Sequence, residues 1–153
     1  MPDPADAARS LLEMNQYAVL ATVDAQGDPW ATPVWFAHRG LDVLLWVSSP
    51  ETRHSQALAA VPRLAVTVFD ASVEPGHGTA FYGRGRAGEC PTQDLEDHLA
   101  AYSRSAVAQG LRAWAVEDVS GGARHRLYVA ELDELSVLLD EVGPERRVPI
   151  VPT

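Results

Sequence analysis

Short runs of β-branched and aromatic residues, separated by turn-forming residues, constrain the fold of this chain more than any other feature. Three such runs cover residues 17–23, 29–38 and 41–48, and Arg39–Gly40 makes the turn between the second and the third. Strands with such tight connections pair antiparallel with their neighbours along the chain. The amino-terminal third of the chain is therefore predicted to form an antiparallel meander.

A helix start follows this meander. Ser49, Pro50 and Glu51 supply a hydroxyl cap, a proline at the first helical position and a carboxylate in the first turn. Because this helix is inserted between strands, the strand–helix alternation typical of a parallel sheet is missing. Helices are predicted over residues 5–14, 50–60, 92–106 and 111–117. Further strands are predicted over 64–69 and 79–89, and residues 124–132 and 135–139 give one or two final strands.

Strands outnumber helices in this pattern, and no repeat or linker divides the chain. We therefore expect a mainly β fold, a six-stranded antiparallel barrel with packed helices, in a single domain over residues 1–153. Closing or nearly closing the barrel removes exposed strand edges. Gly83 and Gly85 lie inside the strand predicted at 79–89, which indicates a bulge or a close backbone approach there.

The charge of the chain argues against one large class of partners. There are 12 basic and 21 acidic residues, a formal net charge of −9, and no stripe of Lys or Arg, so contacts along a nucleic-acid backbone are not expected. The single cysteine, Cys90, allows no intrachain disulfide, which fits a reducing cytoplasm. The longest apolar runs, such as residues 43–47, are too short to cross a bilayer. We expect a soluble, cytoplasmic protein with no membrane partner.

Familiar catalytic motifs are absent from the sequence. The five histidines lack the spacing of metal ligands, and there is no Gly-x-Ser-x-Gly, P-loop or dinucleotide-binding motif. The sequence shows no base beside Cys90 that would activate its thiol. No side chain is therefore predicted to act as a catalytic nucleophile or a metal ligand.

The end of the third strand and the following helix start could bind an anion. Ser48 and Ser49 supply hydroxyl groups, and Arg53 supplies a guanidinium close to the free N–H groups of the helix start. Ordinary capping explains the same residues, with Glu51 complementing the helix dipole and Arg53 solvated. The residues alone leave both interpretations open.

The second strand carries a second unusual feature, which is a proline among aromatic residues. Pro33 removes a ladder donor and therefore indicates an edge, a bulge or a gap beside the strand. A flat aromatic ligand could lie in such a gap. Alternatively, Trp30, Trp35 and Phe36 are aromatic residues of the core or of an interface.

In the order and spacing of these segments, the chain resembles the pyridoxamine 5′-phosphate oxidase-like family of flavin-binding split barrels. The likeness covers roughly residues 10–90 and, more loosely, the last strand. The segments that carry it are Leu20–Asp24, Gly27–Phe36, Leu45–Ser48, Thr52–Leu58, Pro62–Val68 and Tyr82–Ala87.

The resemblance implies a homodimer that holds FMN between its subunits; the alternative cofactor is the 8-hydroxy-5-deazaflavin coenzyme. The flavin ring is then expected along the second strand, and the end of the third strand also contacts the cofactor. The helix start supplies the phosphate ligands. Carried over by position, the ring contacts are Thr32, Pro33, Val34, Trp35, Val47 and Ser48, and the residues of the helix start are Thr52, Arg53 and His54.

Several positions depart from the family pattern. His54 stands where a lysine is usual, and a neutral imidazole is a weaker phosphate partner than an ammonium group. Thr32 and Ala37 replace the arginine and lysine of the oxidase itself, and its carboxy-terminal Arg-x-His motif is missing. The resemblance therefore implies an FMN-dependent oxidoreductase acting on a small molecule other than pyridoxamine phosphate. The alternatives are a deazaflavin-dependent reductase and a non-catalytic or haem-binding split barrel.

Overall fold

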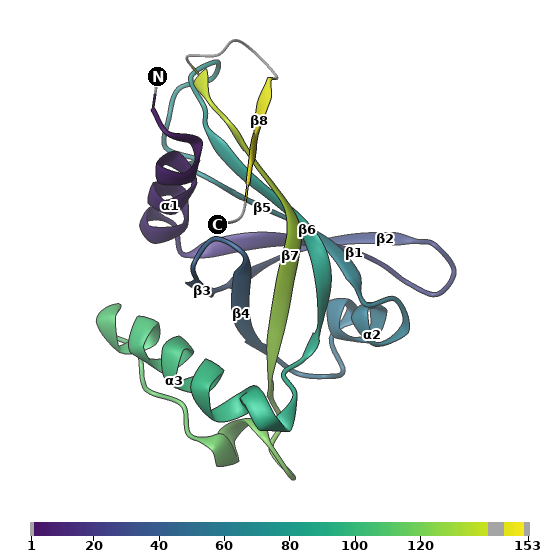
Figure 1. Cartoon of the computed structure of the whole chain (residues 1–153). Coiled ribbons are helices and arrows are strands. Elements are labelled where there is room, and N and C mark those ends of the chain that lie inside the picture. The colour runs from purple at the N-terminus through teal and green to yellow at the C-terminus, as the bar shows by residue number, and fades with distance from the viewer. Residues whose placement is uncertain (1, 141–145, 152–153) are drawn as a thin grey trace.

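The computed structural model describes residues 2–140 and 146–151, and it confirms a mainly β, antiparallel curled half-barrel (Figure 1). The helices are α1 (Pro4–Met14), α2 (Arg53–Ala60), α3 (Thr92–Ala108) and the short 3₁₀ helix η1 (Val116–Val119). The strands are β1 (Tyr17–Val23), β2 (Pro29–Trp35), β3 (Ala37–Arg39), β4 (Val43–Ser48), β5 (Arg63–Phe69), β6 (Ala80–Glu89), β7 (Arg126–Leu138) and β8 (Arg147–Ile150).

The strands form one sheet in the order β2-β1-β5-β6-β7-β4-β3, and β8 pairs with β7. The sheet therefore has seven strands in its main path plus β8, and not the six that were predicted. The run 29–38 is two strands rather than one, because residues 29–35 pair with β1 whereas residues 37–39 pair with β4. Residues 126–138 form a single strand, which is one of the two alternatives expected for residues 124–139.

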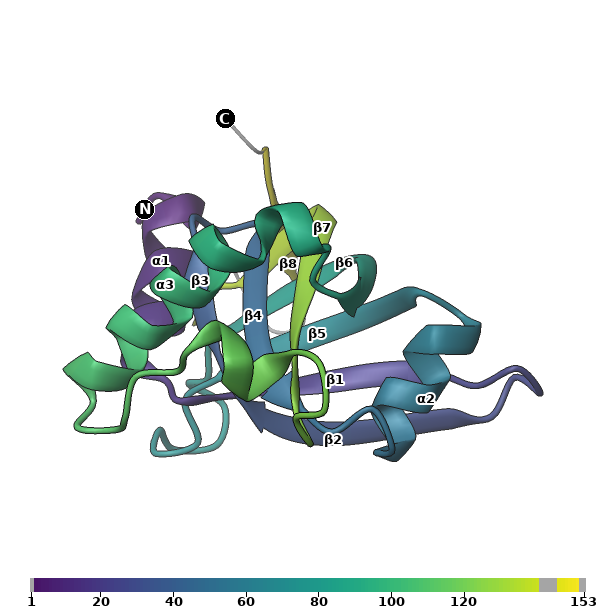
Figure 2. The same cartoon turned by 90° about the horizontal axis from the view of Figure 1, so that it is seen from below.

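Alternate residues along the strands build a core inside the curl. Leu20, Trp46, Phe81 and Val137 are fully buried there, and α1 packs against the same core. A second core lies outside the curl, where α3 covers β3 and β4 (Figure 2). The two faces of β4 therefore both contact hydrophobic residues, as its nearly continuous burial requires.

The predicted irregularity in β6 is confirmed. The pairing with β7 shifts register between Arg84 and Gly85. A β-carbon on Gly85 would overlap the backbone carbonyl of Glu131, so only glycine fits at this close approach.

Two helix predictions need correction. The second helix begins at Arg53 with Thr52 as its N-cap, so Ser49 and Pro50 belong to the preceding turn. Residues 111–117 are not helical apart from the beginning of η1. There the hydroxyl of Ser103 accepts a hydrogen bond from the N–H of Trp114 at 2.9 Å and holds the segment extended. None of the helices within 2–140 and 146–151 has the length and apolar character needed to span a membrane.

Candidate functional site

The connection between β4 and α2 leaves two backbone donors free. Thr52 caps the helix, because its Oγ1 accepts from the N–H of Ser55 at 3.3 Å and donates to the carbonyl of Ser49 at 3.0 Å. Within the described residues, the N–H groups of Arg53 and His54 have no hydrogen-bond partner. Free N–H groups at a helix start carry partial positive charge and attract anions.

Arg53 occupies the first helical position, not a position one turn into the helix. Its side chain is exposed, and its guanidinium carbon lies 4.2 Å from the centroid of the Trp30 ring. Trp30 is on β2 and is 40% exposed. Among residues 2–140 and 146–151, no carboxylate pairs with Arg53. Within the part of the chain that the structure describes, the guanidinium of Arg53 therefore has no ion-pair partner.

His54, in contrast, points into the molecule. It is 8% exposed, and its Nε2 lies 2.8 Å from Ser48 Oγ and 3.3 Å from Thr52 Oγ1. Burial lowers the pKa of His54, which keeps the ring neutral at pH 7. His54 thus ties the end of β4 to the cap of α2, and its role as a phosphate ligand stays a prediction.

The other predicted residues divide between the two faces of the sheet. Trp30, Thr32 and Val34 share one face of β2, and Val34 belongs to the inner core. Pro33 is exposed on the opposite face. The structure thus brings both Ser48 and Thr52 into contact with His54, and Arg53 is the residue before it in the chain.

Trp35 and Val47 lie under α3, away from the helix start. Trp35 stacks edge-on against Tyr102, with ring centroids 5.2 Å apart, and its Nε1 donates to Gln109 Oε1 at 3.0 Å. Val47 packs against the same outer core. Because Pro33, Trp35 and Val47 share a face that Ser48 does not, the expected ring contacts cannot all come from one subunit face. Their contact with a cofactor stays a prediction.

Two features of this region were missed by sequence reasoning. One is the contact between Trp30 and Arg53, which lie in separate motifs and on separate elements. The other lies deeper, where Trp46 stacks on Tyr128 with ring centroids 5.8 Å apart. The Nε1 of Trp46 is buried and has no hydrogen-bond partner within the described part of the chain. Nothing in the spacing of these residues signals either arrangement.

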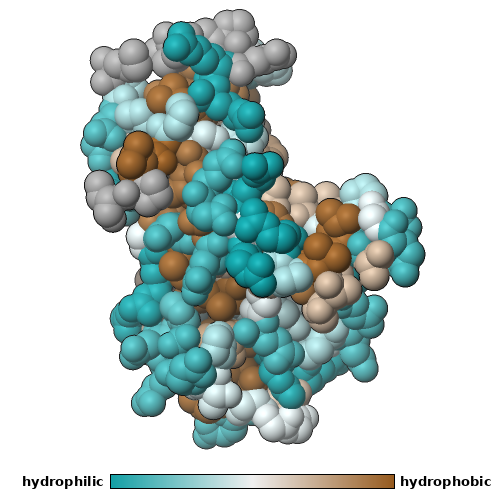
Figure 3. Space-filling model, turned by 45° about the vertical axis from the view of Figure 1, so that its right-hand side comes forward, coloured by the Kyte–Doolittle hydropathy of each residue, from teal (hydrophilic) through white to brown (hydrophobic). Residues whose placement is uncertain are grey.

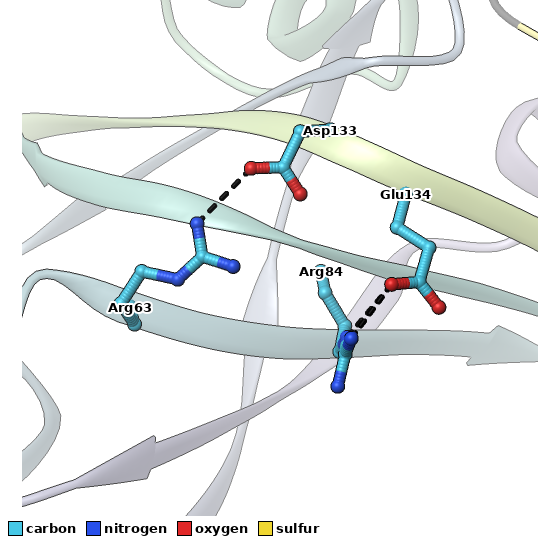
Figure 4. A network of polar contacts seen from close by, with 4 residues as sticks. All are labelled: Arg63, Arg84, Asp133 and Glu134. Atoms are coloured by element: carbon cyan, nitrogen blue, oxygen red, sulfur yellow. Dashed lines mark hydrogen bonds and ion pairs between the residues drawn. The ribbon is translucent and has the colours of Figure 1, made fainter.

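A second group of arginines lies on the outer face of β5, β6 and β7. Arg84 on β6 pairs with Glu134 on the neighbouring strand β7 at 2.7 Å, and Arg63 on β5 reaches across β6 to Asp133 on β7 at 3.0 Å (Figure 4). The two arginines border a shallow hollow of about 370 Å³ whose floor includes Ala65. Unlike Arg53, both have a carboxylate partner.

Other reactive groups are held in unreactive states. Burial, helped by the negative charge of Asp94, raises the pKa of Cys90 to about 11, so its thiol is protonated at neutral pH. Among the residues that the structure describes, no group of three or more His, Cys, Asp or Glu side chains is placed to hold a metal ion.

Comparison with known proteins places this geometry in context. Residues 4–136 match the sequence profile of a family described as pyridoxamine 5′-phosphate oxidase. No curated protein matches the sequence. Several solved structures share the fold.

A haem-binding protein from Mycobacterium smegmatis superposes with a TM-score of 0.76 at 20% identity, over 98% of this chain and 58% of that one. An FAD-binding protein from Mesorhizobium loti gives a TM-score of 0.65 at 20% identity, over 87% and 92% of the two chains. An F420 reductase gives 0.61 at 23% identity, over 89% and 98%. The chain thus spans little more than half the length of the haem-binding protein. At these identities the likeness establishes the fold alone.

Proposed function

Because this chain belongs to the pyridoxamine 5′-phosphate oxidase family, we propose that it is an oxidoreductase that binds FMN at the start of α2. The observation that supports this most directly is the uncompensated guanidinium of Arg53 beside two free helix N–H groups. This donor set suits a phosphate dianion, since a guanidinium and backbone N–H groups give charge-assisted hydrogen bonds. The hydroxyl of Ser49, in the preceding turn, adds a further donor.

The remaining predicted residues would hold the rest of the cofactor. Ser48 lies next to the cap of α2, and Thr32 shares the face of β2 that carries Trp30. Pro33, Trp35 and Val47 lie on the other face, which could contact a cofactor held by a second subunit. A bound flavin supplies hydride or electron transfer, and the protein contributes orientation and exclusion of water. The substrate would be a small molecule other than pyridoxamine phosphate, because Thr32 and Ala37 cannot supply the cations of the oxidase.

A homodimer is part of this proposal. The outer face of β1 and β5 carries the exposed side chains of Tyr17, Val23 and Phe69, at 59%, 39% and 47% exposure. Hydrophobic side chains also gather at the surface of the lobe formed by the β1–β2 hairpin and α2 (Figure 3). Apolar surface of this kind is typical of a symmetric interface. Sedimentation of the flavin-loaded protein as a monomer at micromolar concentration would rule the dimer out.

The proposal is tested by titration with FMN and with riboflavin, which lacks the phosphate. Arg53→Ala should weaken FMN binding by about 1.5–3 kcal/mol, or roughly ten- to hundredfold, because it removes a charge-assisted phosphate contact. Riboflavin should bind equally to both proteins. Arg84→Ala is the matched control, since it removes an exposed arginine that already has a carboxylate partner.

The identity of the cofactor is read from the absorbance of the freshly purified protein. FMN gives a band at about 450 nm, the deazaflavin coenzyme one at about 420 nm, and haem an intense Soret band. Arg53→Ala binding FMN as tightly as wild type would place the phosphate elsewhere. A Soret band without flavin binding would replace the proposed function by haem binding.

A further inference from the structure

We propose that Trp30 is the positioning residue of the phosphate site: its ring holds the Arg53 guanidinium at the start of α2 and thereby sets the affinity for a phosphate ester. The inference rests on the proposed function, because it assigns Trp30 a role at that same site. Trp30 acts here through Arg53 and makes no contact with the phosphate itself.

The contact between the two side chains has the geometry of a cation–π interaction. The guanidinium carbon of Arg53 lies 4.2 Å from the Trp30 ring centroid, inside the range of about 6 Å within which a cation over an indole is attracted. The ring attracts the cation through its quadrupole and adds no negative charge. Arg53 is thus held in place while its charge remains available to an anion.

The backbone of Trp30 is fixed in the ladder with β1, so the ring keeps only its two side-chain rotations. Trp30 pairs with Thr22 on β1, and the buried hydroxyl of Thr22 donates to the carbonyl of Trp30 at 3.4 Å. The adjoining turn is closed by Asp24, whose carboxylate accepts from the N–H of Asp28 at 2.9 Å. A free arginine side chain samples many rotamers, and ordering it costs entropy when a ligand binds. A ring fixed on β2 reduces that cost before the ligand arrives.

Trp30 contributes little to the hydrophobic cores, so it can be substituted without unfolding the protein. Within the described residues, it belongs to neither hydrophobic core, and it is 40% exposed.

The chain also offers a matched arginine–tryptophan pair elsewhere. Arg112 lies 4.0 Å from the Trp114 ring centroid, but it is ion-paired with Asp118 at 3.2 Å. Arg112→Ala therefore removes a stacked arginine whose charge is already compensated.

The experiment compares Trp30→Leu and Trp30→Phe with wild type, using FMN and riboflavin as probes. Trp30→Leu should weaken FMN binding about two- to fivefold, the size of an exposed cation–π contact, and leave riboflavin binding unchanged. Trp30→Phe retains a ring and should recover most of the affinity. Arg112→Ala should change neither titration. Thermal unfolding checks that all variants fold.

A second readout needs no cofactor. In the ligand-free protein, the NMR signal of the Arg53 Nε–H group should show the ring-current shift of a group above an indole, and Trp30→Leu should abolish that shift. If Trp30→Leu binds FMN like wild type while Arg53→Ala is weakened, the positioning role is wrong and the proposed function stands. If Trp30→Leu weakens the binding of FMN and of riboflavin equally, the positioning role is also wrong, because Trp30 would then contact the flavin ring. Failure of the wild-type protein to bind FMN overturns both proposals.

Discussion

The start of α2 and the outer face of β5–β7 both present exposed arginines, but in opposite electrostatic settings. On the outer face, Arg63 and Arg84 lie 3.0 and 2.7 Å from the carboxylates of Asp133 and Glu134 (Figure 4). At the start of α2, Arg53 lies against the ring of Trp30, and no carboxylate of the described residues pairs with it. The same side chain is neutralised in one region and only held in place in the other.

This difference shows how an acidic protein can keep a cationic site. With a net charge of −9, the chain as a whole repels anions at long range. An arginine bridged to a carboxylate offers little to an incoming phosphate, and an exposed bridge contributes at most about 1 kcal/mol to stability. An arginine stacked on an aromatic ring keeps its full charge. The chemical nature of the partner therefore separates a structural arginine from one able to bind a ligand.

In the region of β5–β7, the largest loss of stability is expected from a substitution of Gly85, the residue after Arg84. Gly85→Ala places a β-carbon against the Glu131 carbonyl and should lower the free energy of unfolding by roughly 3 kcal/mol. Gly88→Ala in the same strand is the control, because its β-carbon meets no atom within 4 Å. Urea unfolding measures both. Equal effects of the two substitutions would show that the register shift does not require glycine.

At the start of α2, we expect the stability of the protein to depend on pH through His54. Its folded-state pKa is lowered by burial, so the unfolded chain takes up a proton first as pH falls through about 6.5. Stability should therefore be fully present above this pH and decline below it, until the native state is also protonated. Urea unfolding at a series of pH values between 8 and 5 measures the slope.

His54→Gln is the control for this pH dependence, since it can still bond to Ser48 but does not titrate. A slope of the same size in His54→Gln would show that His54 does not cause the pH dependence.

The smallest expected effect comes from giving Arg53 a carboxylate. Gln56→Glu places one three residues further along α2, on the same side of the helix. The new charge should weaken FMN binding by about 0.5–1 kcal/mol, or two- to fivefold, and less in high salt. Ala59→Glu adds the same charge one turn further from Arg53 along α2 and should have a smaller effect. If Gln56→Glu leaves the affinity unchanged, the compensation of Arg53 is not what separates the two regions.

Local patterns were sufficient to predict most strands. Alternation and turn residues located β1, β4 and β5 to within two residues at either end, and the glycines of β6 indicated its irregularity correctly. Pro33 indicated an edge, a bulge or a gap, and the structure shows the first of these, because β2 is at one end of the sheet. These features depend on residues close together in the chain, which is why the sequence carries them.

The errors arose where contacts between distant segments decide the structure. The cap of α2 is a local exception: Ser49 and Thr52 are both competent caps, and Thr52 bonds to His54 and Ser55, its own neighbours in the chain. The segment after Gly110 is extended because it is bonded to Ser103 on α3. The Trp30–Arg53 contact joins β2 to α2, and no periodicity encodes it. The candidate site is therefore only partly visible in the sequence.

The proline in β2 has a consequence for how copies of this protein can meet. Pro33 pairs with Val19 inside the ladder but has no N–H of its own, at the strand that ends the sheet. An incoming strand would find this border short of a hydrogen-bond donor, so continuous sheets running from one molecule into the next are disfavoured. Edge-to-edge growth of the sheet at β2 is thereby disfavoured, whereas a contact between sheet faces needs no hydrogen-bond donor from this border.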